Sequence, residues 1–129
     1  MIKLDNIKKV FRTDDVETWA LQNVSLEVKE GEFVAIMGPS GCGKSTLLNI
    51  LGLIDNPTEG TYLLNGTDVS RVQENERTEL RKGTIGFVFQ SFNLIEELNV
   101  VENIELPLLY MGISRSERRR CVQEIMERV

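Results

Sequence analysis

The stretch "IMGPSGCGKSTLLNILG", residues 36–52, places four glycines and one lysine between an apolar run and a helical pattern. Inside it, residues 38–45 ("GPSGCGKS") match the phosphate-binding pattern in which two glycines flank four residues before Lys and Ser or Thr. Glycine allows tight turns that point successive N–H groups inward, and the following helix adds the positive end of its dipole. The stretch therefore predicts a nucleotide site. The alternative is a glycine-rich turn that only joins a strand to a helix.

Each residue type in this loop has a predicted task. Lys44 is expected to reach the β and γ phosphates, the Ser45 hydroxyl to bind Mg²⁺, and Thr46 to bond the α phosphate. The backbone cradle is expected to comprise the six residues before the lysine: Gly38, Pro39, Ser40, Gly41, Cys42 and Gly43. A lysine about 4 Å from a phosphate gains about 4 kcal/mol at an effective dielectric of about 20, whereas carboxylates beyond about 8 Å are largely screened. The acidic balance of the chain therefore does not oppose the site.

The composition narrows the class of protein. A chain of 129 residues with 41% hydrophobic content has the size of about one globular domain. Its apolar runs are far shorter than the roughly 20 residues of a membrane-spanning helix, and no signal peptide is evident. The net charge of -5 argues against nucleic-acid binding. Cys42 and Cys121 lie far apart and histidine is absent, so neither a zinc site nor a disulfide framework is predicted, and a reducing cytoplasm fits.

Hydrophobic periodicity predicts the elements around the loop. Residues 2–11 and 20–28 are predicted to form antiparallel strands, the first with a possible bulge. Two continuously apolar runs, residues 33–37 and 84–89, have the pattern of strands buried on both faces. A helix over residues 45–54 is predicted to bury Leu47, Leu48, Leu51 and Ile54. Residues 61–66 indicate a strand that ends in the hairpin signal Asn65-Gly66.

Three further helices are predicted. The first is charged and spans residues 74–82. The second begins at Asn99 with a capping box to Glu102, and Pro107 is expected to bend or interrupt it. The third begins with the same arrangement of Ser114 and Glu117, and its apolar face comprises Val122, Ile125, Met126 and Val129. Arg115 and Arg118 to Arg120 are interpreted as its solvated face rather than an anion site.

Two longer segments then suggest a family. "LQNVSLEVKEGEFVAIMGPSGCGKSTLLNILGLIDNPTEGTYLLNG" closely resembles the nucleotide-binding domain of ATP-binding cassette (ABC) transporters, and "IGFVFQSFNLIEELNVVENIELPLL" resembles its Q-loop region. The second segment is most similar to the macrolide-export and lipoprotein-release type. The resemblance implies an incomplete α/β P-loop NTPase fold, with an antiparallel β subdomain and the start of a helical subdomain. It implies a single partial domain, with an ATP-binding core in residues 1–90 and the helical part in residues 91–129.

The resemblance also implies roles for residues outside the loop. Phe11 matches the aromatic residue that stacks on adenine, although an apolar strand residue is the alternative; Trp19 is expected to pack. Gln90 matches the Q-loop glutamine, which contacts Mg²⁺ and positions the attacking water; a polar strand end is the alternative. Residues 91–111 would receive a membrane permease through Phe92, Leu94 and Ile95, unless these pack in the core. Cys42 is interpreted as a small residue at a variable position rather than a redox group.

The same resemblance sets the expected activity and partners. It implies ATP and Mg²⁺ as cofactors, a permease and a second nucleotide-binding domain in a head-to-tail dimer as partners, and a place on the cytoplasmic face of the cell membrane. The signature loop, the magnesium-associated aspartate, the catalytic glutamate and the switch histidine of the family are not found, so we expect no catalytic residue beyond Gln90 and no meaningful ATP turnover by this chain alone. The alternatives are a non-hydrolysing nucleotide-binding or interaction module, and a small-molecule kinase or GTPase.

Overall fold

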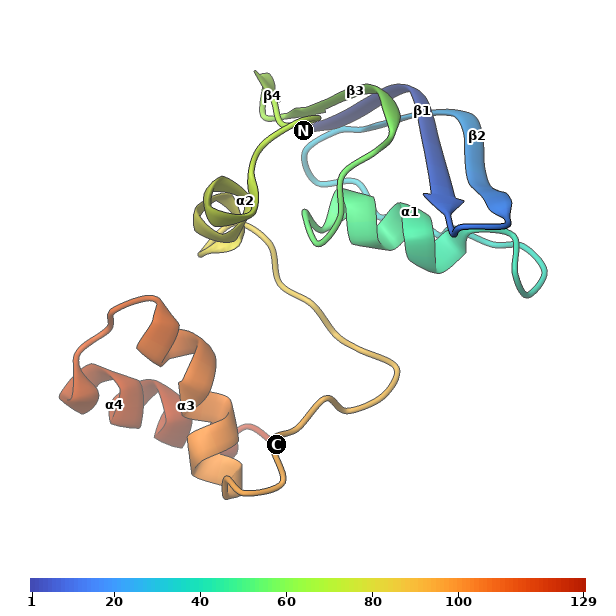
Figure 1. Ribbon diagram of the computed structural model, residues 1–129. Helices are drawn as coiled ribbons and strands as arrows, with labels where there is room; N and C mark the ends of the chain where they lie inside the picture. The colour runs from blue at the N-terminus through green and yellow to red at the C-terminus, as the bar shows by residue number, and fades with distance from the viewer. The chain divides into compact units, whose positions relative to one another are not determined.

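The computed structural model describes residues 1–129 and divides them into two compact units, Met1–Ile85 and Gly86–Val129. The first unit contains four strands and the first two helices, and the second contains α3 and α4 (Figure 1). We describe each unit by itself.

The sheet of the first unit is antiparallel throughout. Its strands are β1 (Ile2–Arg12), β2 (Glu17–Val28), β3 (Glu59–Leu64) and β4 (Thr67–Asp68), in the order β2-β1-β3-β4. The predicted pairing of the first two strands is confirmed, and so is the irregularity, because the register shifts between Leu4 and Ile7. Asn65 and Gly66 join β3 to β4 with positive φ at both residues, as a type I′ hairpin turn requires.

The core of the first unit lies between this sheet and α1 (Lys44–Leu51), which Figure 1 shows beneath β1 and β2. The buried side chains are Leu4, Ile7, Leu21, Leu47, Ile50, Leu53, Tyr62 and Val69. The predicted helix face is only partly correct, because Leu48 is 52% exposed and Ile50 is fully buried. The short helix ends at Leu51, and a turn of the backbone then places Leu53 in the core. The prediction of one continuous helical face over residues 45–54 does not include this turn.

The predicted central strands over residues 33–37 and 84–89 are not formed. Phe33 is 96% exposed and Val88 is 102% exposed, and neither run joins a ladder. A strand exists through hydrogen bonds to a neighbouring strand, and the four strands of this sheet pair only with one another. Part of the apolar pattern is nevertheless used, since Ile36 and Ile85 pack against the core. The composition correctly identifies these segments as apolar, but it does not show whether a neighbouring strand is available to pair with their backbones.

The remaining helices begin where the sequence predicts. α2 spans Glu74–Arg81, α3 spans Val100–Tyr110, and α4 spans Arg115–Met126. The capping box of α3 is confirmed, because Asn99 Oδ1 accepts from Glu102 N (3.0 Å) and Glu102 Oε2 accepts from Asn99 N (2.9 Å). The predicted interruption at Pro107 is wrong, since α3 continues to Tyr110. A proline removes one N–H donor from the helix, and here three helical residues, 108–110, still follow it.

The second unit has little buried surface. Its α3 and α4 pack together, and the side chain of Arg118 joins them by donating from Nε to Glu105 Oε1 at 2.6 Å. Val122 is buried, but Ile125, Met126 and Val129 are exposed, so the predicted apolar face of α4 is largely wrong. Ser114 begins α4 without the predicted capping bond. No helix in either unit has the length and apolar character needed to cross a membrane.

Candidate functional site

The glycine-rich loop lies against strand β2. Gly41 has a φ of 80° and Gly43 a φ of 90°, both in the left-handed region that favours glycine. A Cβ atom on Gly43 would lie 2.4 Å from Ala20 O and 2.9 Å from Leu21 Cδ2. Gly43 is therefore required twice, by its backbone conformation and by its close approach to β2. The two left-handed residues turn the backbone just before the start of α1.

The N-terminal end of α1 carries no internal counter-charge. Its N-cap is Gly43, which offers no side-chain bond to the helix, and its first turn contains no acidic residue. Orphan N–H groups and the positive end of the helix dipole are therefore left without a side-chain partner. Ser45 is exposed in this first turn, and Thr46 is half-buried beside it. An anion is the chemical group that such a helix end binds best.

Lys44 folds back over the loop that precedes it. Its Nζ donates to Gly38 O at 2.7 Å and to Pro39 O at 2.6 Å, and lies 3.6 Å from Cys42 Sγ. A positive charge is thereby held on the same loop as the left-handed glycines. The Cys42 thiol is free and exposed, so it forms no disulfide.

Phe11 lies near the end of the β1–β2 ribbon. The residue is 47% exposed, and Lys9 Nζ lies 5.2 Å from the centroid of its ring. Val10, the residue before it, pairs with Trp19, which is followed by the Ala20 that approaches Gly43. The ribbon therefore presents an accessible aromatic face on strands that adjoin the loop.

Gln90 belongs to the second unit, Gly86–Val129. It is exposed in an irregular segment, and its side chain makes no hydrogen bond. The two predicted parts of the site, the loop and the glutamine, therefore belong to separate compact units.

Sequence reasoning missed the residues that hold the far end of α1. Tyr62 Oη donates to Leu51 O at 2.8 Å, Arg81 Nη1 donates to Leu53 O at 2.7 Å, and Arg77 Nη1 donates to Ile54 O. Burial raises the pKa of Tyr62 to about 12. No sequence pattern announces these contacts, because the donors lie 11 to 28 residues from their acceptors.

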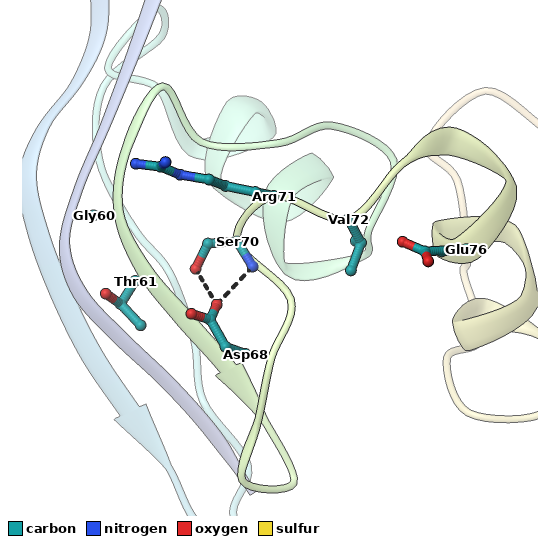
Figure 2. Close-up of a pocket in the computed structure, with 7 residues that line it drawn as sticks. All are labelled: Gly60, Thr61, Asp68, Ser70, Arg71, Val72 and Glu76. Atoms are coloured by element: carbon teal, nitrogen blue, oxygen red, sulfur yellow. Dashed lines mark hydrogen bonds between the residues drawn. The ribbon is translucent and has the colours of Figure 1, made fainter.

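A second hollow, of about 500 Å³, lies beside β3, β4 and the start of α2 (Figure 2). Asp68 accepts from both the backbone N–H and the hydroxyl of Ser70, at 2.9 and 2.5 Å, and these bonds hold the pKa of its carboxyl below the usual range. Glu76 accepts from Gln73 N in the capping box of α2. The two acidic groups of this hollow, Asp68 and Glu76, therefore stabilise the local turns. The hollow is lined by Gly60, Thr61, Asp68, Ser70, Arg71, Val72 and Glu76.

Comparison with known proteins settles the family. The family model described as "ABC transporter" matches residues 21–129, which include the glycine-rich loop, α1 and Gln90. The chain belongs to the ABC transporter family. The sequence-based resemblance is confirmed, and the chain matches part of the ATP-binding domain of that family.

Relatives of this ABC chain agree with the family model. An ABC transporter ATP-binding protein of Thermotoga maritima is 46% identical over 129 residues, which are 100% of this chain and 55% of the relative. The macrolide export ATP-binding/permease protein MacB of Campylobacter fetus is 47% identical over 98% of this chain and 20% of its own length. The similarity to the macrolide-export type is therefore confirmed. The chain spans about half the length of the ATP-binding proteins that it matches, and a smaller share of MacB.

A solved structure gives the fold. The ATP-binding cassette MJ0796, bound to ADP and Pi, has a TM-score of 0.90 and 46% identity, covering 98% of this chain and 56% of that chain. The predicted α/β P-loop NTPase class is thus confirmed for this ABC chain.

Proposed function

We propose that this chain binds Mg-ATP at residues 38–46 as the ATP-binding part of an ABC transporter. The observation that carries the proposal is the uncapped N-terminal end of α1, which begins at Lys44 directly after the left-handed Gly43. Backbone N–H groups, a helix dipole and one lysine converge there, and this combination matches a polyphosphate better than any other ligand class. The MJ0796 cassette, bound to ADP and Pi, supports the proposal.

The residues present fit a magnesium nucleotide. Lys44 would exchange its bonds to Gly38 O and Pro39 O for phosphate oxygens, and the loop amides would donate to the same group. The exposed Ser45 hydroxyl would be a ligand of Mg²⁺, and Thr46 would donate to the α phosphate. Phe11 would stack on adenine, a contact worth about 1–3 kcal/mol. When bound, Mg-ATP supplies the transferable phosphoryl group, and the chain supplies position and charge.

The second unit would connect the site to a membrane permease. Gln90 would contact Mg²⁺ and position the attacking water, and the segment after it would dock the permease. Support comes from an apolar hollow of about 380 Å³ lined by Leu94, Ile95, Glu96, Leu98, Val100, Asn103 and Ile104. Phe92, which precedes Leu94 by two residues in the sequence, is 87% exposed. These exposed apolar residues favour docking over core packing, which was the alternative from sequence alone.

In the complete protein, we propose that a second nucleotide-binding domain completes the site in a head-to-tail dimer. ATP hydrolysis would then drive transport from the cytoplasmic face of the membrane. We assign the ATP-binding core to residues 1–90 and the start of the helical subdomain to residues 91–129. MacB joins ATP-binding and permease functions in its name, and the MJ0796 structure is dimeric, which supports both kinds of partner.

Calorimetric titration of the purified chain with Mg-ATP tests the proposal. We expect saturable binding that Lys44→Ala weakens by at least about tenfold, because the variant removes the single positive charge of the loop. Lys3→Ala, on an exposed position of β1, is the control and should bind as the wild type does. Equal affinity of Lys44→Ala and the wild-type chain, or no binding of Mg-ATP by the wild type, would contradict the assignment of the site.

A further inference from the structure

The C-terminal end of α1 is held in an unusual conformation. Leu53, just beyond the helix, has a φ of 54°, although glycine or asparagine usually occupies this position. Its N–H donates to Ile50 O at 3.0 Å, and Ile54 N donates to Asn49 O at 2.8 Å, which closes the helix in a Schellman motif. A buried leucine adopts a left-handed backbone only where surrounding contacts determine it.

Side chains from two other elements supply those contacts. Tyr62 from β3 donates to Leu51 O, and Arg81 and Arg77 from α2 donate to Leu53 O and Ile54 O. Arg81 makes the 2.7 Å bond and also donates from Nη2 to Thr78 Oγ1 at 3.1 Å, so its guanidinium is fixed on both sides. The two arginines also place positive charge at the negative end of the helix dipole.

These contacts bear on the nucleotide loop because α1 is short. Its eight residues span about 12 Å, with Lys44 at one end and the Leu51–Leu53 turn close to the other. A hydrogen-bonded helix of this length moves as a rigid rod, so a displacement of its C-terminal end displaces Lys44 and the loop amides as well. We propose that Arg81 is a positioning residue for the phosphate-binding loop, acting through the carbonyl of Leu53.

This inference rests on the proposed nucleotide site, so its test has one readout that needs no nucleotide. We would compare wild type, Arg81→Gln and Arg81→Lys by amide NMR shifts of residues 41–46 without ligand, and then by Mg-ATP titration. Arg71→Gln is the matched control, because Arg71 is an exposed arginine of the same unit with no hydrogen bond from its side chain. Tyr62 is unsuitable as the first variant because its ring is fully buried in the core.

We expect Arg81→Gln to shift the loop amides and to weaken Mg-ATP binding about threefold to tenfold. Arg81→Lys retains a cationic donor and should restore most of both signals. Unchanged amide shifts in a folded Arg81→Gln variant would overturn the inference whether or not the chain binds nucleotide. If Arg81→Gln does not fold, Arg77→Gln should move the same amides less, and a result in which they do not move would again overturn it. Loss of binding by the Arg71→Gln control would also count against a specific role of Arg81.

Discussion

At the residue scale, the conformation of the glycine-rich loop, residues 38–45, depends on which of its glycines another residue could replace. Gly41 and Gly43 share a left-handed backbone, but a Cβ would meet open space at Gly41 and the backbone oxygen of Ala20 at Gly43. The two positions therefore separate the cost of backbone strain from the cost of a steric clash.

We predict that Gly41→Ala lowers the free energy of unfolding by about 1 kcal/mol, the cost of a left-handed non-glycine residue. Gly43→Ala should lower it by about 1–3 kcal/mol more, because the added methyl must push the loop away from β2. Urea unfolding followed by Trp19 fluorescence measures both, since Trp19 is the single tryptophan and lies on β2. Equal losses in the two variants would show that the approach to Ala20 is not constrained.

Tyr62 provides a prediction for alkaline pH. Its pKa is raised to about 12 in the folded chain by burial, compared with about 10 for an unfolded tyrosine. The unfolded state therefore loses its proton first, so this contribution to stability is complete below about pH 10 and is lost as the pH rises towards about 12. The loss over that range is about 1–3 kcal/mol.

The measurement is urea unfolding of wild type and Tyr62→Phe at about pH 9 and pH 11. The phenylalanine variant loses the bond to Leu51 O and should be less stable at the lower pH. Its stability should then fall less between the two pH values than that of the wild type. An identical fall in both proteins would show that Tyr62 does not carry the alkaline sensitivity.

At the scale of elements, neighbouring residues in the sequence determine where a helix begins, whereas residues distant in the sequence determine how it packs. The capping box of Asn99 and Glu102 spans four residues, so the sequence alone specifies both partners. The buried face of α1 depends instead on the β1 and β2 side chains that meet it.

We predict that Asn99→Ala destabilises α3 by about 1 kcal/mol, through loss of the bond from Glu102 N. Ser114→Ala is the control at the start of α4, because Ser114 makes no capping bond to its helix. Hydrogen exchange of the α3 and α4 amides reports each helix separately. Faster exchange in α4 of Ser114→Ala than in α3 of Asn99→Ala would contradict the capping geometry.

At the scale of the whole molecule, burial is distributed unevenly. Every buried core side chain of the hydrophobic cluster belongs to the Met1–Ile85 unit, whereas the Gly86–Val129 unit buries only Val122. A unit with one buried side chain gains little from the hydrophobic effect, so its helices open at a lower free energy than the sheet.

We predict that thermal and urea unfolding are not two-state. Helical circular dichroism, to which α3 and α4 contribute, should decrease before the fluorescence of Trp19 in the first unit changes. Exposed Phe33 and Met37 should also favour association of the isolated chain. Coincident transitions by the two probes in a monomeric sample would contradict this prediction.

The elements that sequence predicted well are those whose partners are close along the chain. The Asn65-Gly66 turn, the Asn99 capping box and the glycine positions of the loop all follow from local backbone geometry. The sequence by itself therefore determined the family, the phosphate-binding pattern and the starts of the helices.

Only the tertiary structure decided which apolar segments are paired and which helix faces are buried. The run of residues 33–37 has strand composition yet forms no ladder, because pairing requires a second strand and composition does not supply one. The hydrogen bond from Arg81 to Leu53 O joins two residues that lie 28 positions apart, and no local sequence pattern relates them. Local backbone preferences are encoded within a few residues, whereas burial and long-range hydrogen bonds exist only once distant segments share the same space.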